Sequence, residues 1–96
     1  MIDPQYLLTD EQMRDFIVDG YVVLRSSLPA SFHQQIYDRT LQVFEDEGNP
    51  GNNILPRVPQ LRHVFDDPSV RGALTSVLGP DYIMHSHRHC HINQGK

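Results

Sequence analysis

The 96-residue sequence contains a single cysteine, Cys90, and no long run of apolar residues. One cysteine cannot form a disulfide within the chain, which indicates a reducing compartment. A membrane-spanning helix needs roughly 18 or more consecutive apolar residues, and no stretch of this sequence approaches that length. The N-terminus also lacks the basic segment and following apolar segment of a secretory signal. We therefore predict a soluble, cytoplasmic protein with no membrane partner.

Basic residues are scarce as well. The sequence has 8 Lys and Arg against 12 Asp and Glu, so its formal net charge is −4 with histidine neutral. Binding to the phosphates of nucleic acid favours a basic face, so this balance predicts no nucleic-acid partner. Apolar residues make up 39% of the chain, which allows a modest core. Neither an internal repeat nor a low-complexity tract is present.

Helix signals divide the first 80 residues. Thr9-Asp10-Glu11-Gln12 is a capping-box pattern, and Gly20 suits a left-handed helix end, so we expect a helix over residues 10–19. Pro29 and a helical spacing of apolar residues predict a second helix over residues 30–47. Asp67-Pro68 and Gly79 bound a third helix over residues 68–78. A short helical turn is expected near residues 61–65.

Between these helices we expect a short strand and a long loop. Tyr21-Val22-Val23-Leu24 is rich in β-forming residues and is predicted to be a buried strand. Residues 48–59 are predicted to form a loop, in which Pro56 and Pro59 hold Arg57 in an extended backbone. Two interpretations of Arg57 stay open: a solvated loop charge, or a cation positioned for a carboxylate.

The last stretch, residues 82–93, carries four of the six histidines at a spacing of two. After Gly79-Pro80-Asp81, which breaks a helix, this spacing predicts a long strand with all four imidazoles on one face. The histidines are His85, His87, His89 and His91. Neighbouring imidazoles on a strand can bind Zn²⁺, Cu²⁺ or Ni²⁺, so a metal-binding module is one interpretation. His33 and His63 are expected to be isolated surface or partly buried histidines.

The predicted order of elements is helix, short strand, long helix, loop, helix, long strand. Two uneven strands make a marginal sheet, which indicates an α+β domain whose other strands come later in the sequence. The most buried side chains are expected at the inward positions of these elements. They are Phe16, Ile17, Val22, Leu24, Ile36, Leu74, Val77 and Leu78.

Several short motifs together resemble the phytanoyl-CoA dioxygenase family. They are Thr9-Asp10-Glu11-Gln12 with Phe16, then Asp19-Gly20-Tyr21-Val22-Val23-Leu24, Asp67-Pro68, Leu78-Gly79-Pro80-Asp81-Tyr82 and His91-Ile92-Asn93. The resemblance covers nearly the whole chain. It implies that residues 1–96 are the N-terminal part of one dioxygenase domain, incomplete at its C-terminus. That part would hold the N-terminal helices and first strands of a double-stranded β-helix, a jelly-roll relative. The complete protein would be an Fe(II)- and 2-oxoglutarate-dependent oxygenase that hydroxylates a small organic substrate.

The resemblance also says which site residues to expect. Members of the family bind iron with a His-x-Asp pair and a later histidine, but this sequence contains no His-x-Asp, so the pair is expected after Lys96. No catalytic or iron-binding residue is therefore assigned, and neither cofactor nor activity is expected for this chain alone. Arg57 stands where the family has a basic residue near 2-oxoglutarate, and Cys90 stands where a residue lines the cosubstrate pocket. If Cys90 faces that pocket, the four histidines face away from it. Besides the metal-binding module, a non-catalytic interaction fragment stays an alternative.

Overall fold

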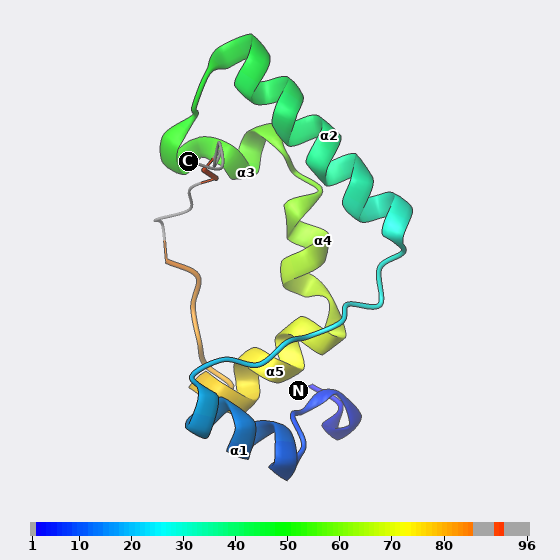
Figure 1. The fold of residues 1–96 in the computed structure, drawn as a ribbon, viewed down its shortest axis with the longest axis vertical. Coiled ribbons are helices and arrows are strands. Elements are labelled where there is room, and N and C mark those ends of the chain that lie inside the picture. Colours follow the sequence, from blue (N-terminus) through cyan, green and yellow to red (C-terminus); the bar gives the residue numbers. More distant parts are fainter. Residues whose placement is uncertain (1, 86–89, 92–96) are drawn as a thin grey trace. The chain divides into compact units, whose positions relative to one another are not determined.

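The computed structural model describes residues 2–85 and 90–91, which form two compact units (Figure 1). The first unit comprises Met1–Leu28 and His63–Ile83, and the second comprises Pro29–Arg62 and Met84–Lys96. Within the described residues every regular element is a helix. None of these helices combines the length and the apolar character that crossing a membrane requires.

The predicted α+β class is wrong, because the described residues are 64% helical and contain no strand or sheet. Residues 21–24 and the described part of the predicted long strand, 82–85 and 90–91, have no regular structure. A strand is stable only when a second strand satisfies its backbone N–H and C=O groups, and the described residues contain no strand to supply that pairing. The start of a jelly roll is therefore not seen. Residues 86–89 and 92–93 of the predicted strand lie outside the described residues.

In the first unit, α1 (Asp10–Asp19) has the predicted bounds. The Thr9 hydroxyl accepts from the Gln12 N–H at 3.1 Å, and the Gln12 side chain accepts from the Thr9 N–H at 2.9 Å, which confirms the capping box. Gly20 ends the helix with a φ of 82°, a left-handed conformation that glycine adopts without strain.

The segment before α1 packs against α5 (Pro68–Leu78), whose bounds were also predicted. This segment contains a short 3-10 helix, η1 (Pro4–Tyr6), which the sequence did not indicate. The Leu8 N–H donates to the Ser76 hydroxyl at 2.9 Å. At Gly72 the approach is so close that an added Cβ would lie 1.9 Å from the Tyr6 carbonyl oxygen. Glycine at this position therefore lets η1 lie directly on α5.

The second unit is built on α2 (Ala30–Glu47), which again has the predicted bounds. The predicted loop over residues 48–59 is wrong in part, because it contains η2 (Gly51–Asn53) and α3 (Ile54–Arg57). The Val58 N–H donates to the Ile54 carbonyl at 2.9 Å and closes this short helix. The expected helical turn near residue 61 is confirmed as α4 (Leu61–Asp66), which contains the boundary between the units.

The apolar core of the second unit consists of Val43, Ile54 and Val58, with exposed fractions of 4% or less. Ile36, Leu61 and Cys90 pack around it. The predicted list of buried residues is wrong here, since it names neither Val43 nor Val58. It also includes Ile17 and Leu78, whose exposed fractions are 74% and 62%. That prediction took the apolar positions of each element as inward-facing, but at Ile17 and Leu78 the side chains are largely exposed.

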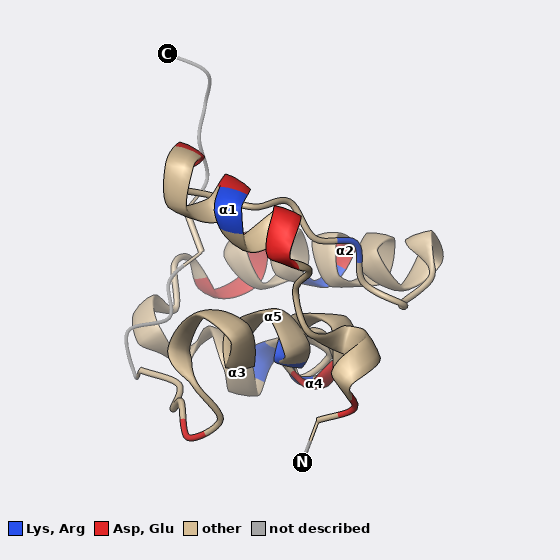
Figure 2. Ribbon diagram, turned by 90° about the horizontal axis from the view of Figure 1, so that it is seen from below, with Lys and Arg blue, Asp and Glu red and all other residues tan. Residues whose placement is uncertain are grey.

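Charged residues are distributed along the helices rather than concentrated on one of them (Figure 2). In α1, Arg14 lies 3.5 Å from Asp15 and 4.0 Å from Glu11, and the three side chains are between 49% and 78% exposed. Exposed pairs of this kind contribute about 0–1 kcal/mol each to stability.

Candidate functional site

Arg57 is the last residue of α3, and its side chain is held by the end of α2. Its Nε donates to the Glu47 carboxylate at 2.8 Å, and its Nη1 donates to the Asn53 carbonyl at 3.2 Å. The Arg57 carbonyl in turn accepts from the Arg39 guanidinium at 3.0 Å. The predicted extended backbone between two prolines is therefore wrong, since this residue ends a helical turn. The sequence also missed Glu47, because its ten-residue separation from Arg57 follows no helical spacing.

The Arg57 guanidinium is only partly engaged. A guanidinium has five N–H donors. Within the described residues, only the Nε–H and one Nη1–H of Arg57 donate hydrogen bonds. The Arg57 and Glu47 side chains are 36% and 44% exposed, so water screens their attraction. Such a pair contributes about 0–1 kcal/mol, which means that another carboxylate can replace Glu47 at little energetic cost. A weak, partly exposed pair of this kind suits reversible binding of an anion at Arg57 better than a permanent ion pair with Glu47.

Cys90 is half-buried against the apolar cluster formed by Val43, Ile54 and Val58. Val58 directly follows Arg57 and is fully buried. Residues 57 and 90, which are far apart in the sequence, thus belong to the same unit and to the surroundings of one cluster. The resemblance expected both residues near one cosubstrate pocket.

The histidine stretch is only partly described. His85 and His91 are exposed and take part in interactions within the molecule, whereas His87 and His89 lie outside the described residues. In the described part of the chain, no three His, Cys, Asp or Glu side chains come together as a metal-ligand set. An iron site needs two histidines and a carboxylate on one face of the metal, so the described residues do not fit this group. His33 and His63 are exposed, as predicted for surface histidines, and each takes part in an interaction within the molecule.

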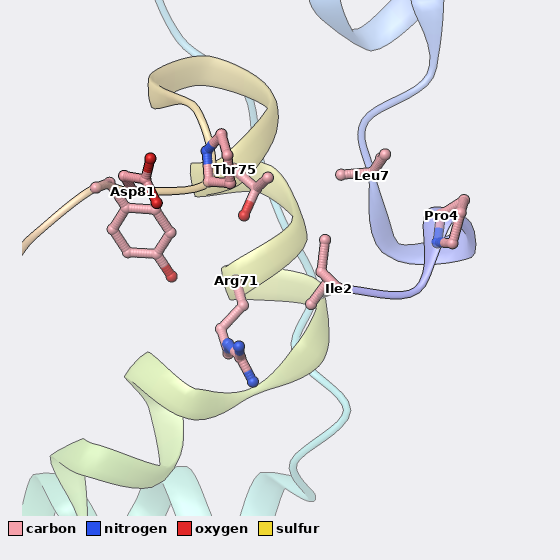
Figure 3. Close-up of a pocket in the computed structure, with 8 residues that line it drawn as sticks. Ile2, Pro4, Leu7, Arg71, Thr75 and Asp81 are labelled. Atoms are coloured by element: carbon pink, nitrogen blue, oxygen red, sulfur yellow. The ribbon is translucent and has the colours of Figure 1, made fainter.

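A cavity of about 680 Å³ opens in the first unit, beside α5 (Figure 3). Ile2 and Leu7 form an apolar wall, while Arg71 and Thr75 project from one face of α5. Asp81 and Tyr82 complete the lining. No sequence signal pointed to this cavity, because its walls come from the N-terminal segment, from α5 and from residues 80–82, which are brought together by the packing of η1 on α5.

Asp67 is the most buried charged residue of the described chain, with 3% of its surface exposed. Its carboxylate accepts from the Ser27 N–H at 3.1 Å, the Ser27 hydroxyl and the Ser69 N–H at 3.1 Å. Burial raises the pKa of this carboxyl. Those hydrogen bonds and one from the Val70 N–H lower the pKa by more than burial raises it, so the net pKa lies below its ordinary value of 3.8. All of these hydrogen bonds join Asp67 to other residues of the chain, so its role is structural: it holds Ser27 at the start of α5.

No protein-family model, curated protein or solved structure matches this chain. The resemblance to the phytanoyl-CoA dioxygenase family thus stays a prediction from the motifs.

Proposed function

We propose that this chain is the N-terminal part of a cytoplasmic, Fe(II)- and 2-oxoglutarate-dependent oxygenase that hydroxylates a small organic substrate. In this proposal Arg57 binds a carboxylate of 2-oxoglutarate, and Cys90 lines the same pocket. The iron ligands would come from residues beyond Lys96. The chain by itself is then expected to have no oxygenase activity.

The observation that carries the proposal is the common position of the two residues. Cys90 packs on the cluster that contains Val58, and Val58 is the neighbour of Arg57. The Arg57 N–H donors that no described residue accepts from add support, because planar pairs of N–H donors match a carboxylate.

Glu47 has a defined part in this proposal. Its carboxylate pairs with the Arg57 guanidinium at 2.8 Å. In this proposal a 2-oxoglutarate carboxylate takes the place of the Glu47 carboxylate at the Arg57 guanidinium. Glu47→Gln should therefore favour cosubstrate binding, since it removes the competing negative charge.

The first test is the coding sequence after Lys96, together with the activity of the protein that it encodes. We expect a His-x-Asp pair, about one bound iron per chain and turnover of 2-oxoglutarate to succinate. Replacing the histidine or aspartate of that pair should remove the iron. His91→Ala should retain it. Absence of the pair, or loss of iron in a folded His91→Ala protein, would overturn the proposal.

The second test concerns Arg57 in the same protein. Arg57→Ala should raise the KM for 2-oxoglutarate by about 10- to 100-fold, the effect of one charged hydrogen-bonding partner. Arg57→Lys should stay close to the original value because the family has lysine there. The matched control is Arg62→Ala, since Arg62 is an exposed arginine of the same unit. Equal effects at Arg57 and Arg62 would contradict the assignment.

Zinc titration of the 96-residue chain separates this proposal from the metal-binding module. Stoichiometric, tight binding that is lost in His87→Ala or His89→Ala would favour the module. Weak binding, unchanged in these variants, is expected if the histidines have no role as metal ligands.

A further inference from the structure

The four-residue helix α3 is too short to fix the Arg57 backbone by itself. An isolated helix is marginal below about 12 residues, because its first turn orders several residues for a single hydrogen bond. Within the described residues, the side chain of the N-cap residue Asn53 makes no capping hydrogen bond either. The position of Arg57 at the end of α3 therefore depends on contacts with another element.

That element is α2, which reaches α3 through three residues at helical spacing. Arg39, Val43 and Glu47 are four residues apart, so they follow one another along a single face of α2. The Arg39 Nε–H donates to the Arg57 carbonyl at 3.0 Å, and the Glu47 carboxylate accepts from the Arg57 Nε–H at 2.8 Å. Between these two contacts, Val43 belongs to the same apolar cluster as Val58. One face of α2 thus holds the backbone of Arg57 at one point and its side chain at another.

The two polar contacts that α2 makes with Arg57 differ in their relation to a bound cosubstrate. In the proposed function, on which this inference rests, a cosubstrate carboxylate takes the place of Glu47 at the Arg57 guanidinium. The hydrogen bond from Arg39 uses the backbone carbonyl instead, so it does not compete for the guanidinium. Carbonyls in the last turn of a helix have no partner inside that helix, and an arginine side chain can supply one. The Arg39 bond is therefore compatible with a bound cosubstrate, whereas the Glu47 pair is not.

We propose that Arg39 is a positioning residue for the carboxylate-binding arginine: it fixes the Arg57 backbone on α2 and does not itself contact the cosubstrate. Holding a binding group in place before the ligand arrives lowers the ordering cost of binding. Loss of the Arg39 hydrogen bond should weaken 2-oxoglutarate binding and leave the chemical step unchanged. The effect should be smaller than that of losing Arg57, because this bond is exposed and its acceptor is neutral.

The experiment uses two substitutions that differ in one hydrogen-bond donor. The Nε2 of glutamine is as many bonds from the backbone as the Nε of arginine, so Arg39→Gln keeps an N–H donor and removes the charge. Arg39→Met keeps an unbranched side chain and removes the donor. In the complete protein, Arg39→Met should raise the KM for 2-oxoglutarate by about 3- to 10-fold with kcat unchanged. Arg39→Gln should stay within about 2-fold of the original KM.

The matched control is Gln35→Met, at an exposed position of α2 one turn before Arg39, and it should change neither KM nor kcat. If Arg57→Ala raises the KM and Arg39→Met does not, the positioning role is overturned while the proposed function stands. If Arg39→Gln is impaired as much as Arg39→Met, the charge of Arg39 acts rather than its N–H group, and the positioning role is again overturned. An effect on kcat alone has the same consequence.

A measurement on the 96-residue chain decides the positioning role without any activity. The Arg57 Nε–H donates to Glu47, and its exchange with solvent can be followed by nuclear magnetic resonance. Arg39→Met should speed this exchange by about 3- to 10-fold, because a displaced Arg57 backbone moves the guanidinium away from Glu47, and Arg39→Gln should leave the rate unchanged. These results are expected even if the complete protein proves not to be an oxygenase. An unchanged rate in a folded Arg39→Met chain would overturn the inference.

Discussion

At the scale of single residues, Asp67 joins local and distant structure. One carboxylate oxygen caps α5 through the Ser69 N–H, and the other holds Ser27, which is 40 residues away in the sequence. The capping role follows from the Asp-Pro pattern, because Asp is a favoured N-cap and Pro a favoured first helical residue. The contact with Ser27 has no local signal. It connects the segment between α1 and α2 to the start of α5.

The hydrogen bonds of Asp67 predict how the free energy of unfolding depends on pH. The folded pKa of Asp67 is lowered below 3.8, so its stabilisation is present above the unfolded pKa and is lost as the pH falls through the folded pKa. Asp67→Asn should lower the free energy of unfolding by about 1–3 kcal/mol at pH 7, and this difference should shrink below about pH 4.

The measurement is urea unfolding of both proteins, followed by circular dichroism at several pH values. Asp66→Asn is the matched control, because Asp66 is the exposed neighbouring carboxylate. Its difference from the original chain should stay within about 0.5 kcal/mol at every pH. A constant difference for Asp67→Asn from pH 7 down to the acid range would show that its charge has no role.

At the scale of elements, the contact between η1 and α5 depends on the absence of a side chain. Glycine inside a helix usually costs about 1 kcal/mol relative to alanine, so Gly72 looks unfavourable in the sequence. The structure explains its presence, because Gly72 is buried beneath the Tyr6 backbone. The Ser76 hydroxyl, which accepts from Leu8 and donates to the Gly72 carbonyl, joins the same contact.

Gly72→Ala should therefore destabilise the chain, although the substitution favours an isolated helix. The added methyl group would collide with the Tyr6 carbonyl and displace η1, at a cost of about 1–3 kcal/mol. Arg71→Ala, at the neighbouring exposed position, should change stability by less than about 0.5 kcal/mol. The measurement is the thermal unfolding of both variants and of the original chain. A Gly72→Ala chain that is more stable than the original would disprove the close approach of Tyr6 to Gly72.

At the scale of the whole molecule, apolar side chains are buried unequally. Val43, Ile54 and Val58 form a well-buried cluster in the second unit, whereas Val18, Val23 and other apolar residues of the first unit stay largely exposed. Burial stabilises by about 25 cal/mol per Å² of apolar surface, so the cluster contributes far more than the exposed valines do.

Two valine substitutions measure this contrast. Val58→Ala should cost about 1–3 kcal/mol, because it leaves a cavity at a fully buried position. Val18→Ala, at a position that is 75% exposed, should change stability by no more than about 0.5 kcal/mol. Chemical denaturation followed by helical circular dichroism reports both values. Similar costs at the two positions would mean that the second unit has no distinct core in solution.

The sequence by itself determined the three longer helices, because caps, prolines, glycines and helical spacing are local signals. It also led to Arg57 and Cys90 through motifs that resemble a family. The tertiary structure decided whether the β-prone segments became strands, since a strand exists only with a partner. It likewise decided the pairing of Arg57 with Glu47, the burial of Val58 and the contact of Gly72 with Tyr6. Each depends on residues brought together by the chain's path, and no local spacing encodes that path.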